Sequence, residues 1–101
     1  MEVKSFFFTS GIEVIAKLIN TGPSTYVIQD PLVVHMMRGP DGSPQLAFAP
    51  MSMVRKDQDI TVFAHALMTE PVDVEDAVET SYLSNTSGLQ IVGAGSQLLQ
   101  G

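Results

Sequence analysis

Apolar and polar side chains alternate along residues 12–19, IEVIAKLI, and this period of two is typical of a β-strand. Four further runs, rich in apolar, β-branched and aromatic residues, cover positions 3–8, 25–37, 45–54 and 60–68. Clusters of turn-forming or charged residues separate the runs at 9–11, 20–24, 38–44 and 55–59. The pattern therefore predicts about five strands at short spacing within the first 68 residues.

The spacing of apolar residues changes after Met68. Apolar side chains at positions 74, 77, 78 and 82 lie at helical spacing, Pro71 suits a first turn, and acidic residues suit a helix N-terminus. The spacing predicts one amphipathic helix over residues 72–83, stopped by SNTSG at 84–88. We therefore expect a β-barrel at residues 1–69, with an acidic helix and a glycine-rich tail at 70–101 packed outside it on the same domain.

The borders of such a sheet need partners, because an uncovered strand exposes a row of backbone hydrogen-bonding groups. Closure into a small barrel, or pairing of edges between identical subunits, satisfies those groups. The consecutive side chains of Phe6, Phe7 and Phe8 cannot all point inward, since side chains alternate along a strand. We expect at least one of them to lie on the outer face, against the helix or a neighbouring subunit.

Composition and charge limit the partners and the location that we expect for this chain. The chain has 101 residues, no cysteine and a formal net charge of −6, and it has no apolar run long enough to span a membrane. All five basic residues fall within positions 1–56, whereas positions 57–101 hold seven acidic residues and no base. An acidic chain is a poor prior for nucleic-acid binding, although the first half can still present local positive charge. A cytoplasmic location is expected.

No sequence motif for catalysis, nucleotide binding or metal binding occurs in the chain. His35 and His65, the two histidines, each lie among apolar neighbours in a strand pattern, which is typical of a hydrogen-bonded sheet residue. The carboxylates at 73–79 are typical of a solvated helix face rather than a cation site. We therefore expect a protein that is not an enzyme and carries no cofactor or metal. A small hydrolase using His35 or His65 is the least favoured alternative.

Two short segments resemble the Sm and LSm family of small ring-forming barrels. In the first, Phe8-Thr9-Ser10-Gly11 precedes Val14-Ile15-Ala16-Lys17-Leu18, a loop at 20–25 and a strand that begins at Tyr26. In the second, Met53-Val54-Arg55-Lys56-Asp57 is similar to the family's turn between its last two strands. The resemblance covers roughly residues 6–66 and is nearest to phage-encoded LSm-like proteins of marine metagenomes. For a phage-encoded chain, the expected cytoplasm is that of the host cell. Alanine and lysine replace motif glycines at positions 16 and 56, and Gly22 and Tyr26 align with the family's base-clasping Asp and Asn.

The resemblance implies a mostly-β fold, a small five-stranded and strongly bent barrel of the Sm-like or SH3-like kind, with the C-terminal helix as an addition. It also implies a homo-oligomeric ring of roughly five to seven copies around a pore. The nucleic-acid-binding residues that it implies are Ser24, Thr25, Tyr26, Arg55, Lys56 and Asp57. In that arrangement Arg55 and Lys56 form a positive collar, and Tyr26 stacks on an unpaired base. The alternative is that Tyr26 is an ordinary strand aromatic and that the basic pair belongs to a solvated turn.

Two functions follow as expectations. The first is a ring-forming module that binds single-stranded RNA or DNA during processing or chaperoning, with no membrane contact. The second is a structural or adaptor ring in phage assembly that binds protein only, which the net acidity and the methionine and phenylalanine content favour.

Overall fold

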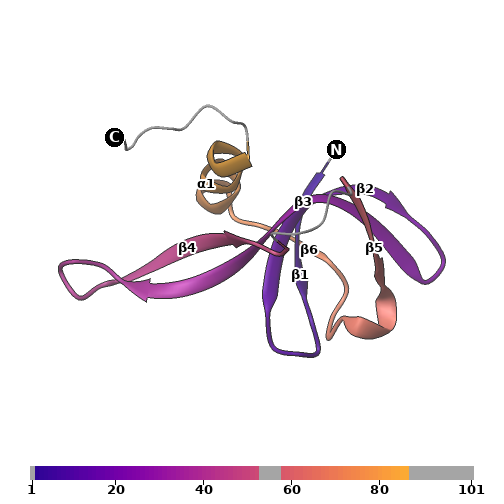
Figure 1. Ribbon diagram of the computed structural model, residues 1–101, viewed down its shortest axis with the longest axis horizontal. Helices are drawn as coiled ribbons and strands as arrows, with labels where there is room; N and C mark the ends of the chain where they lie inside the picture. Colours follow the sequence, from indigo (N-terminus) through magenta and orange to yellow (C-terminus); the bar gives the residue numbers. More distant parts are fainter. Residues whose placement is uncertain (1, 53–57, 87–101) are drawn as a thin grey trace.

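The computed structural model describes residues 2–52 and 58–86, which form one antiparallel sheet and one α-helix (Figure 1). The longer strands are β1 (Glu2–Phe7), β2 (Glu13–Thr21), β3 (Thr25–Arg38), β4 (Pro44–Pro50) and β5 (Asp59–Phe63). A 3-10 turn η1 (Ala64–Ala66), a short strand β6 (Val72–Asp73) and the helix α1 (Asp76–Thr86) follow. The prediction of a mostly-β chain with a C-terminal helix is confirmed.

The strands are arranged in the order β4-β3-β2-β1-β6, and β5 pairs with β3. One edge of β3 is shared by two strands in succession: β5 pairs with residues 25–29 and β4 with residues 32–38. Between these segments Asp30 has a φ of 51°, in the left-handed region, and it precedes Pro31, which has no amide hydrogen. The backbone therefore changes direction at Asp30 and Pro31.

The turn between β1 and β2 is tight and centred on Gly11. The Phe8 amide donates to the Ile12 carbonyl and the Gly11 amide donates to the Phe8 carbonyl, both over 2.9 Å. Gly11 has a φ of 98°, which residues with a Cβ rarely adopt. Glycine at this position therefore lets β2 return directly along β1, with Phe6 opposite Val14.

A hydrophobic core fills the concave side of the bent sheet. Its fully buried members are Phe6, Val14, Ala16 and Ile28, with Val62 from β5 nearly so. Phe8 packs against this core, whereas Phe7 is 37% exposed. The prediction that at least one phenylalanine of the run faces outward is confirmed, because the pleat turns neighbouring side chains to opposite faces.

The opposite face of the sheet is covered by α1. Tyr82 is fully buried there against Val3 and Ile15, and its hydroxyl donates a 2.7 Å hydrogen bond to the Asp30 carbonyl. Val74 and Val78 pack around the same cluster. The helix thus packs on the face of the sheet opposite the first core, mainly through Tyr82 and Val78, which lie one turn apart; Val74 precedes the helix.

Three predicted features are corrected. The sheet is not closed into a barrel: β4 runs outward along β3 past the end of β2, and β6 reaches β1 with only two residues. The helix begins at Asp76 rather than at 72, because Val72 and Asp73 pair with Ser5 and Lys4 of β1. The strand predicted at 60–68 ends at Phe63, where the chain turns into η1.

None of the helices in the described part of the chain combines the length and the hydropathy needed to span a bilayer.

Candidate functional site

The first group of predicted binding residues lies in the turn between β2 and β3. The Gly22 amide donates to the Thr25 carbonyl over 2.8 Å, and the Ser24 carbonyl accepts a 2.9 Å hydrogen bond from the Ala64 amide. Thr25 is also opposite Phe63 in the register of β3 and β5. The structure therefore brings Ser24 and Thr25 beside the end of β5. The second predicted group, Arg55, Lys56 and Asp57, lies outside the described residues.

Tyr26 has a packing role in this structure. Its ring meets that of Phe6 edge to face, with 6.1 Å between the ring centres and 68° between the planes. The side chain is half-buried against the concave core. Aromatic pairs with this geometry stabilise a core beyond the area they bury. What the structure shows of Tyr26 therefore matches the alternative in which it is a strand aromatic.

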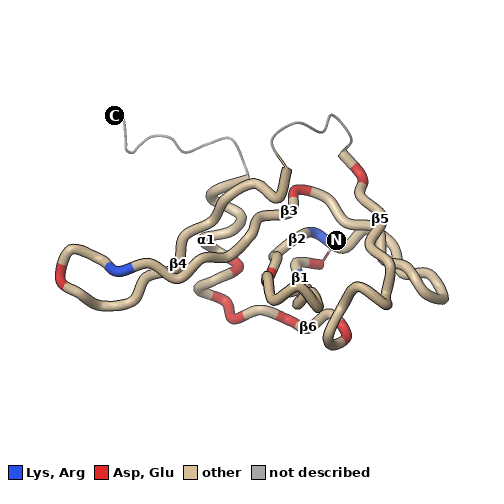
Figure 2. Tube along the Cα trace, turned by 60° about the horizontal axis from the view of Figure 1, so that its bottom comes forward, with Lys and Arg blue, Asp and Glu red and all other residues tan. Residues whose placement is uncertain are grey.

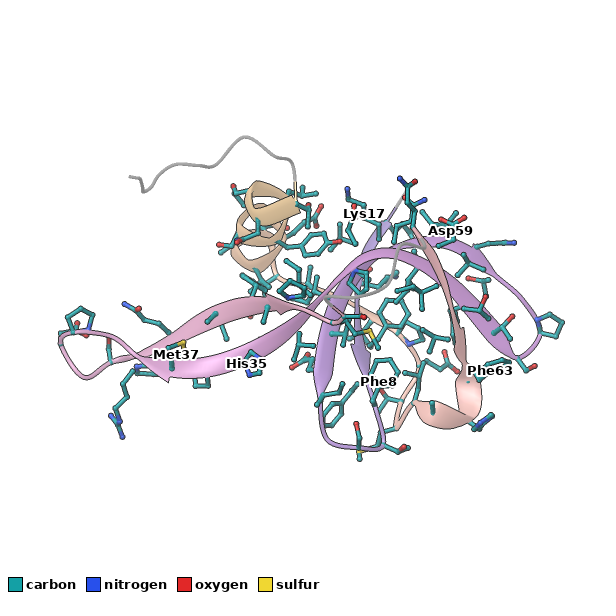
Figure 3. All side chains as sticks on the ribbon, in the orientation of Figure 1. Phe8, Lys17, His35, Met37, Asp59 and Phe63 are labelled. Carbon is teal, nitrogen blue, oxygen red and sulfur yellow. The ribbon has the colours of Figure 1, made fainter. Side chains whose placement is uncertain are left out.

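An exposed aromatic pair beside this turn was not expected from the sequence. The rings of Phe63 and His65 stack with 5.8 Å between their centres and 22° between their planes. Phe63, which is labelled in Figure 3, is 54% exposed, and His65 is also exposed. Alternation along a longer predicted strand would put both residues on one face, but not in contact at a strand end. The 3-10 turn η1 brings the two rings together.

The two histidines are not brought together. His35 lies on β3 opposite Ala47, far along the molecule from Phe63, on which His65 stacks (Figure 3). Within residues 2–52 and 58–86 no group of three or more His, Asp or Glu side chains is arranged to hold a metal ion. The hydrolase alternative therefore gains no geometric support from the described residues.

The most prominent surface feature is a hairpin that leaves the body of the molecule. We call residues 34–38 of β3 and 44–48 of β4, with the turn between them, the projecting arm (Figure 1). β2 accompanies β3 only as far as Val33, which is opposite Val14. Among the described residues, positions 34–38 of β3 therefore have no strand partner other than β4, and β4 is itself the edge of the sheet.

The projecting arm is apolar as well as open-edged. Met36 is 67% exposed, Met37 is 57% exposed and Leu46, opposite Met36, is 44% exposed. Met36 and Met37 are consecutive, so they lie on opposite faces of the hairpin. Figure 3 shows Met37 well out along the arm, away from the core. Large apolar side chains lie on both faces of this thin hairpin. Covering such a surface lowers the free energy, because apolar area is removed from water.

The turn at the tip of the arm is well ordered by its own side chains. The Ser43 amide and hydroxyl both donate to Asp41, over 3.0 and 2.6 Å, and these bonds lower the pKa of the Asp41 carboxyl. Arg38 donates to the Gly42 carbonyl over 2.8 Å. Gly42 has a φ of 84°, which this turn requires. The tip therefore holds the two strands of the arm in one register.

Among the described residues, two of the three Lys and Arg side chains form ion pairs with carboxylates. Lys4 lies 2.7 Å from Asp73, whose hydrogen bond raises the pKa of the lysine, and Lys17 lies 3.0 Å from Asp30. Arg38, by contrast, makes no ion pair with any described carboxylate. Figure 2 shows a basic position on the arm and a series of acidic positions from β6 into α1. The arm thus carries one charge of each sign, from Arg38 and Asp41, and the acidic positions from β6 into α1 have no basic residue among them.

A groove of about 240 Å³ lies at the root of the arm, between the sheet and the segment that leads into α1. We call it the root groove; Ile15, Val34, Leu46, Val72, Val74 and Val78 supply its apolar lining. Ser5 and the carboxylates of Glu13, Asp73 and Glu75 complete the lining. Glu13 accepts a 2.6 Å bond from Ser5, and Asp73 is paired with Lys4, whereas the Glu75 side chain has no described partner. The root groove is therefore apolar with an acidic border.

No model of a known protein family matches the chain, and no curated protein matches it.

Proposed function

We propose that this chain is a structural or adaptor protein that assembles with copies of itself through the projecting arm. The observation that carries this proposal is a two-stranded hairpin whose two backbone edges no described residue covers, with Met36, Met37 and Leu46 exposed. A two-stranded hairpin alone in water is marginally stable. Pairing with a further strand satisfies the open backbone groups, and side chains of the added strand cover part of the exposed apolar surface.

The charge distribution supports a protein partner over a nucleic acid. Phosphate contacts from Lys and Arg supply most of the affinity of proteins for nucleic acids. Of the described basic residues, Lys4 and Lys17 are already paired with carboxylates. Assembly through backbone edges and apolar side chains needs no such cluster of positive charge. A ring of roughly five to seven copies is one closed form that this assembly takes if its contacts are head to tail.

An arm-shortened variant tests the proposal. Residues 36–46 are replaced by Asn-Gly, which joins His35 to its register partner Ala47 through a two-residue turn. The body of the sheet and both cores are left unchanged, so we expect the variant to fold. Light scattering should find the unmodified chain as multiples of its 10.9 kDa mass and the variant as a monomer. Equal masses for the two proteins would overturn the proposal.

Point variants separate loss of the arm surface from loss of folding. Met37→Glu places a charge on the arm, and Met68→Glu makes the same change at a methionine that is 56% exposed outside the arm. Because both side chains are more than half exposed, neither change should lower the melting temperature much. We expect Met37→Glu to reduce the assembled fraction and Met68→Glu to leave it unchanged. The same effect for both variants would contradict a specific role of the arm.

The exposed stack of Phe63 and His65 favours a second candidate, binding of a single-stranded nucleic acid in a ring of LSm type. An exposed aromatic ring can stack on an unpaired base, which is worth about 1–3 kcal/mol per base. The stack adjoins Ser24 and Thr25, two residues that the family resemblance implies for this role. This candidate also uses Arg55 and Lys56 as its source of positive charge.

Anisotropy of short labelled single-stranded RNA and DNA at low salt tests this candidate. Phe63→Ala should weaken binding about tenfold or more, whereas Phe7→Ala, at an exposed phenylalanine of another strand, should not. An Arg55→Ala, Lys56→Ala double variant should weaken binding to all sequences alike. No binding by the unmodified chain at low salt would eliminate the candidate and leave protein assembly as the function.

A further inference from the structure

We infer that two copies of the chain join through the outer edges of their β4 strands, antiparallel and centred on Ala47, so that their sheets become continuous. This inference rests on the proposed function and names the surface of self-association. The occupant of the β4 edge is the same strand of a second copy. Three observations carry it: the direction of the backbone groups of β4, the placement of its two prolines and the absence of charge along it.

The hydrogen bonds at the two ends of the β3–β4 ladder show which backbone groups of β4 point away from β3. The Met51 amide donates to the Pro31 carbonyl over 3.2 Å, and the Gly39 amide donates to the Ser43 carbonyl over 2.8 Å. Hydrogen-bonded and non-hydrogen-bonded pairs alternate along an antiparallel ladder. The odd-numbered residues of β4 therefore bond to β3, and its even-numbered residues turn their backbone groups outward, to the edge of the sheet.

Both prolines of β4 lie at outward positions. Pro44 and Pro50 have no amide hydrogen, so β4 offers outward donors only at Leu46 and Phe48, and neither amide has a partner among residues 2–52 and 58–86. The prolines are equally distant from Ala47. When two copies pair about Ala47, proline lies opposite proline, and Leu46 of each copy lies opposite Phe48 of the other. Both donors of each copy then meet carbonyls, and a shifted register would leave part of each strand unopposed.

The side chains at the centre of this pair are apolar and share one face. Leu46 and Phe48 are two positions apart, and both line a groove of about 280 Å³ between β4 and α1. A two-fold axis perpendicular to the sheet relates the copies, so both turn this face to the same side. Leu46, which is 44% exposed, then enters the second copy's groove beside its Phe48. Ala77 and Ser81 line the α1 side of the groove, and their small side chains leave room there.

β4 lacks the charge that commonly protects an edge strand. Charged side chains, lysine above all, keep exposed edges from pairing. Each of the other described strands contains at least one Asp, Glu, Lys or Arg, whereas β4, PQLAFAP, contains none. Two opposed β4 strands therefore bring no like charges together, although the chain has a net charge of −6. Its prolines confine pairing to the middle of the strand.

A cysteine crosslink tests the register, because the unmodified chain has no cysteine. In the pair, the two copies of position 47 form a non-hydrogen-bonded pair with Cα atoms about 4.5 Å apart, a separation that a disulfide accepts. Ala47→Cys should therefore give a covalent dimer on mild oxidation, measured by non-reducing electrophoresis. Gln45→Cys, on the same face of the same strand, is the matched control, because the two copies of position 45 lie about 14 Å apart.

Proline variants test the hydrogen bonds on the full chain. Leu46→Pro removes an outward donor of β4, and Met36→Pro removes an outward donor of β3, on the opposite edge of the same arm. Edge strands tolerate proline where the amide has no partner, so both variants should fold. Leu46→Pro removes one donor from each copy of the pair, and it should raise the dissociation constant of self-association about tenfold or more. Met36→Pro should leave it within about twofold.

The outcomes separate this inference from the proposed function. If the unmodified chain associates but Ala47→Cys crosslinks no faster than Gln45→Cys, self-association stands and the contact through β4 is wrong. Equal effects of Leu46→Pro and Met36→Pro on association would also show that the β4 edge is not the contact. If the unmodified chain is a monomer, the proposed function fails, and this inference fails with it. Circular dichroism of each variant distinguishes a lost contact from a lost fold.

Discussion

At the scale of single residues, burial decides which members of a repeated sequence carry the fold. Phe6 and Phe7 are neighbours of identical chemistry, yet Phe6 is fully buried and Phe7 is 37% exposed. The pleat of β1 alone produces this difference, since one side chain enters the concave core and the next does not. On the other face of the sheet Tyr82 corresponds to Phe6, because it is the fully buried residue of α1.

Phe6→Ala should therefore lower the free energy of unfolding by about 3–5 kcal/mol, because it removes a buried ring and leaves a cavity. Phe7→Ala should lower it by about 1 kcal/mol or less. Urea denaturation of the two variants and the unmodified chain measures both values. Equal losses at the two positions would contradict the strand orientation described for β1.

Tyr82 makes stability depend on alkaline pH. Burial, with a further contribution from the Asp30 carboxylate, raises the pKa of Tyr82 above its ordinary value of 10.0. Above that pH the tyrosine ionises in the unfolded chain but not in the folded one, so unfolding becomes more favourable. We expect stability to fall as the pH rises beyond about 10.

Tyr82→Phe should remove part of this alkaline loss. At neutral pH it should cost about 1 kcal/mol, because the Asp30 carbonyl loses its 2.7 Å donor. Thermal melts between about pH 7 and pH 11, at steps of about one unit, measure both effects. A variant with the same alkaline decline as the unmodified chain would show that Tyr82 ionises as freely when folded as when unfolded.

At the scale of elements, period and turn chemistry predict much of this fold. The alternation at 12–19 predicts β2, the Asn20–Ser24 turn predicts the start of β3, and apolar spacing predicts a helix that packs outside the sheet. The boundaries of the later elements differ because pairing with distant strands decides them. Val72 and Asp73 suit a helix by their own spacing, but β1 offers them an open edge.

The spacing of apolar and polar residues along the chain does not predict the projecting arm or the stack of Phe63 and His65. Residues 34–38 and 44–48 look like ordinary strands, and only the length of β2 shows that they extend past the sheet. Phe63 and His65 meet because η1 replaces the predicted continuation of a strand. Both features depend on where neighbouring elements end. Neither surface was therefore expected from the sequence, and the candidates at Ser24 and Thr25 stay a prediction.

Hydrogen exchange should distinguish the arm from the body of the sheet. In dilute solution, amides of residues 34–38 and 44–48 should exchange far faster than those of Val14 and Ala16, which are fully buried in the central sheet. At high protein concentration the amides of Leu46 and Phe48 should become protected as arms pair. Equal protection of the arm at both concentrations would argue that the arm needs no partner.

At the scale of the whole molecule, the protein is a small bent sheet. A buried cluster covers each of its two faces, whereas its outer hairpin is uncovered. The concave core and the α1 side each have their buried cluster. The net charge of −6 keeps free copies apart at long range, and added salt screens that repulsion while leaving apolar contacts intact. Assembly then depends on the balance between this repulsion and the open backbone edges and exposed methionines of the arm.

Sedimentation equilibrium of the unmodified chain over a wide concentration range tests this account most directly. The account predicts species whose masses are whole multiples of 10.9 kDa and whose proportions rise with concentration. A single 10.9 kDa species at every concentration, with the sheet intact by circular dichroism, would contradict it.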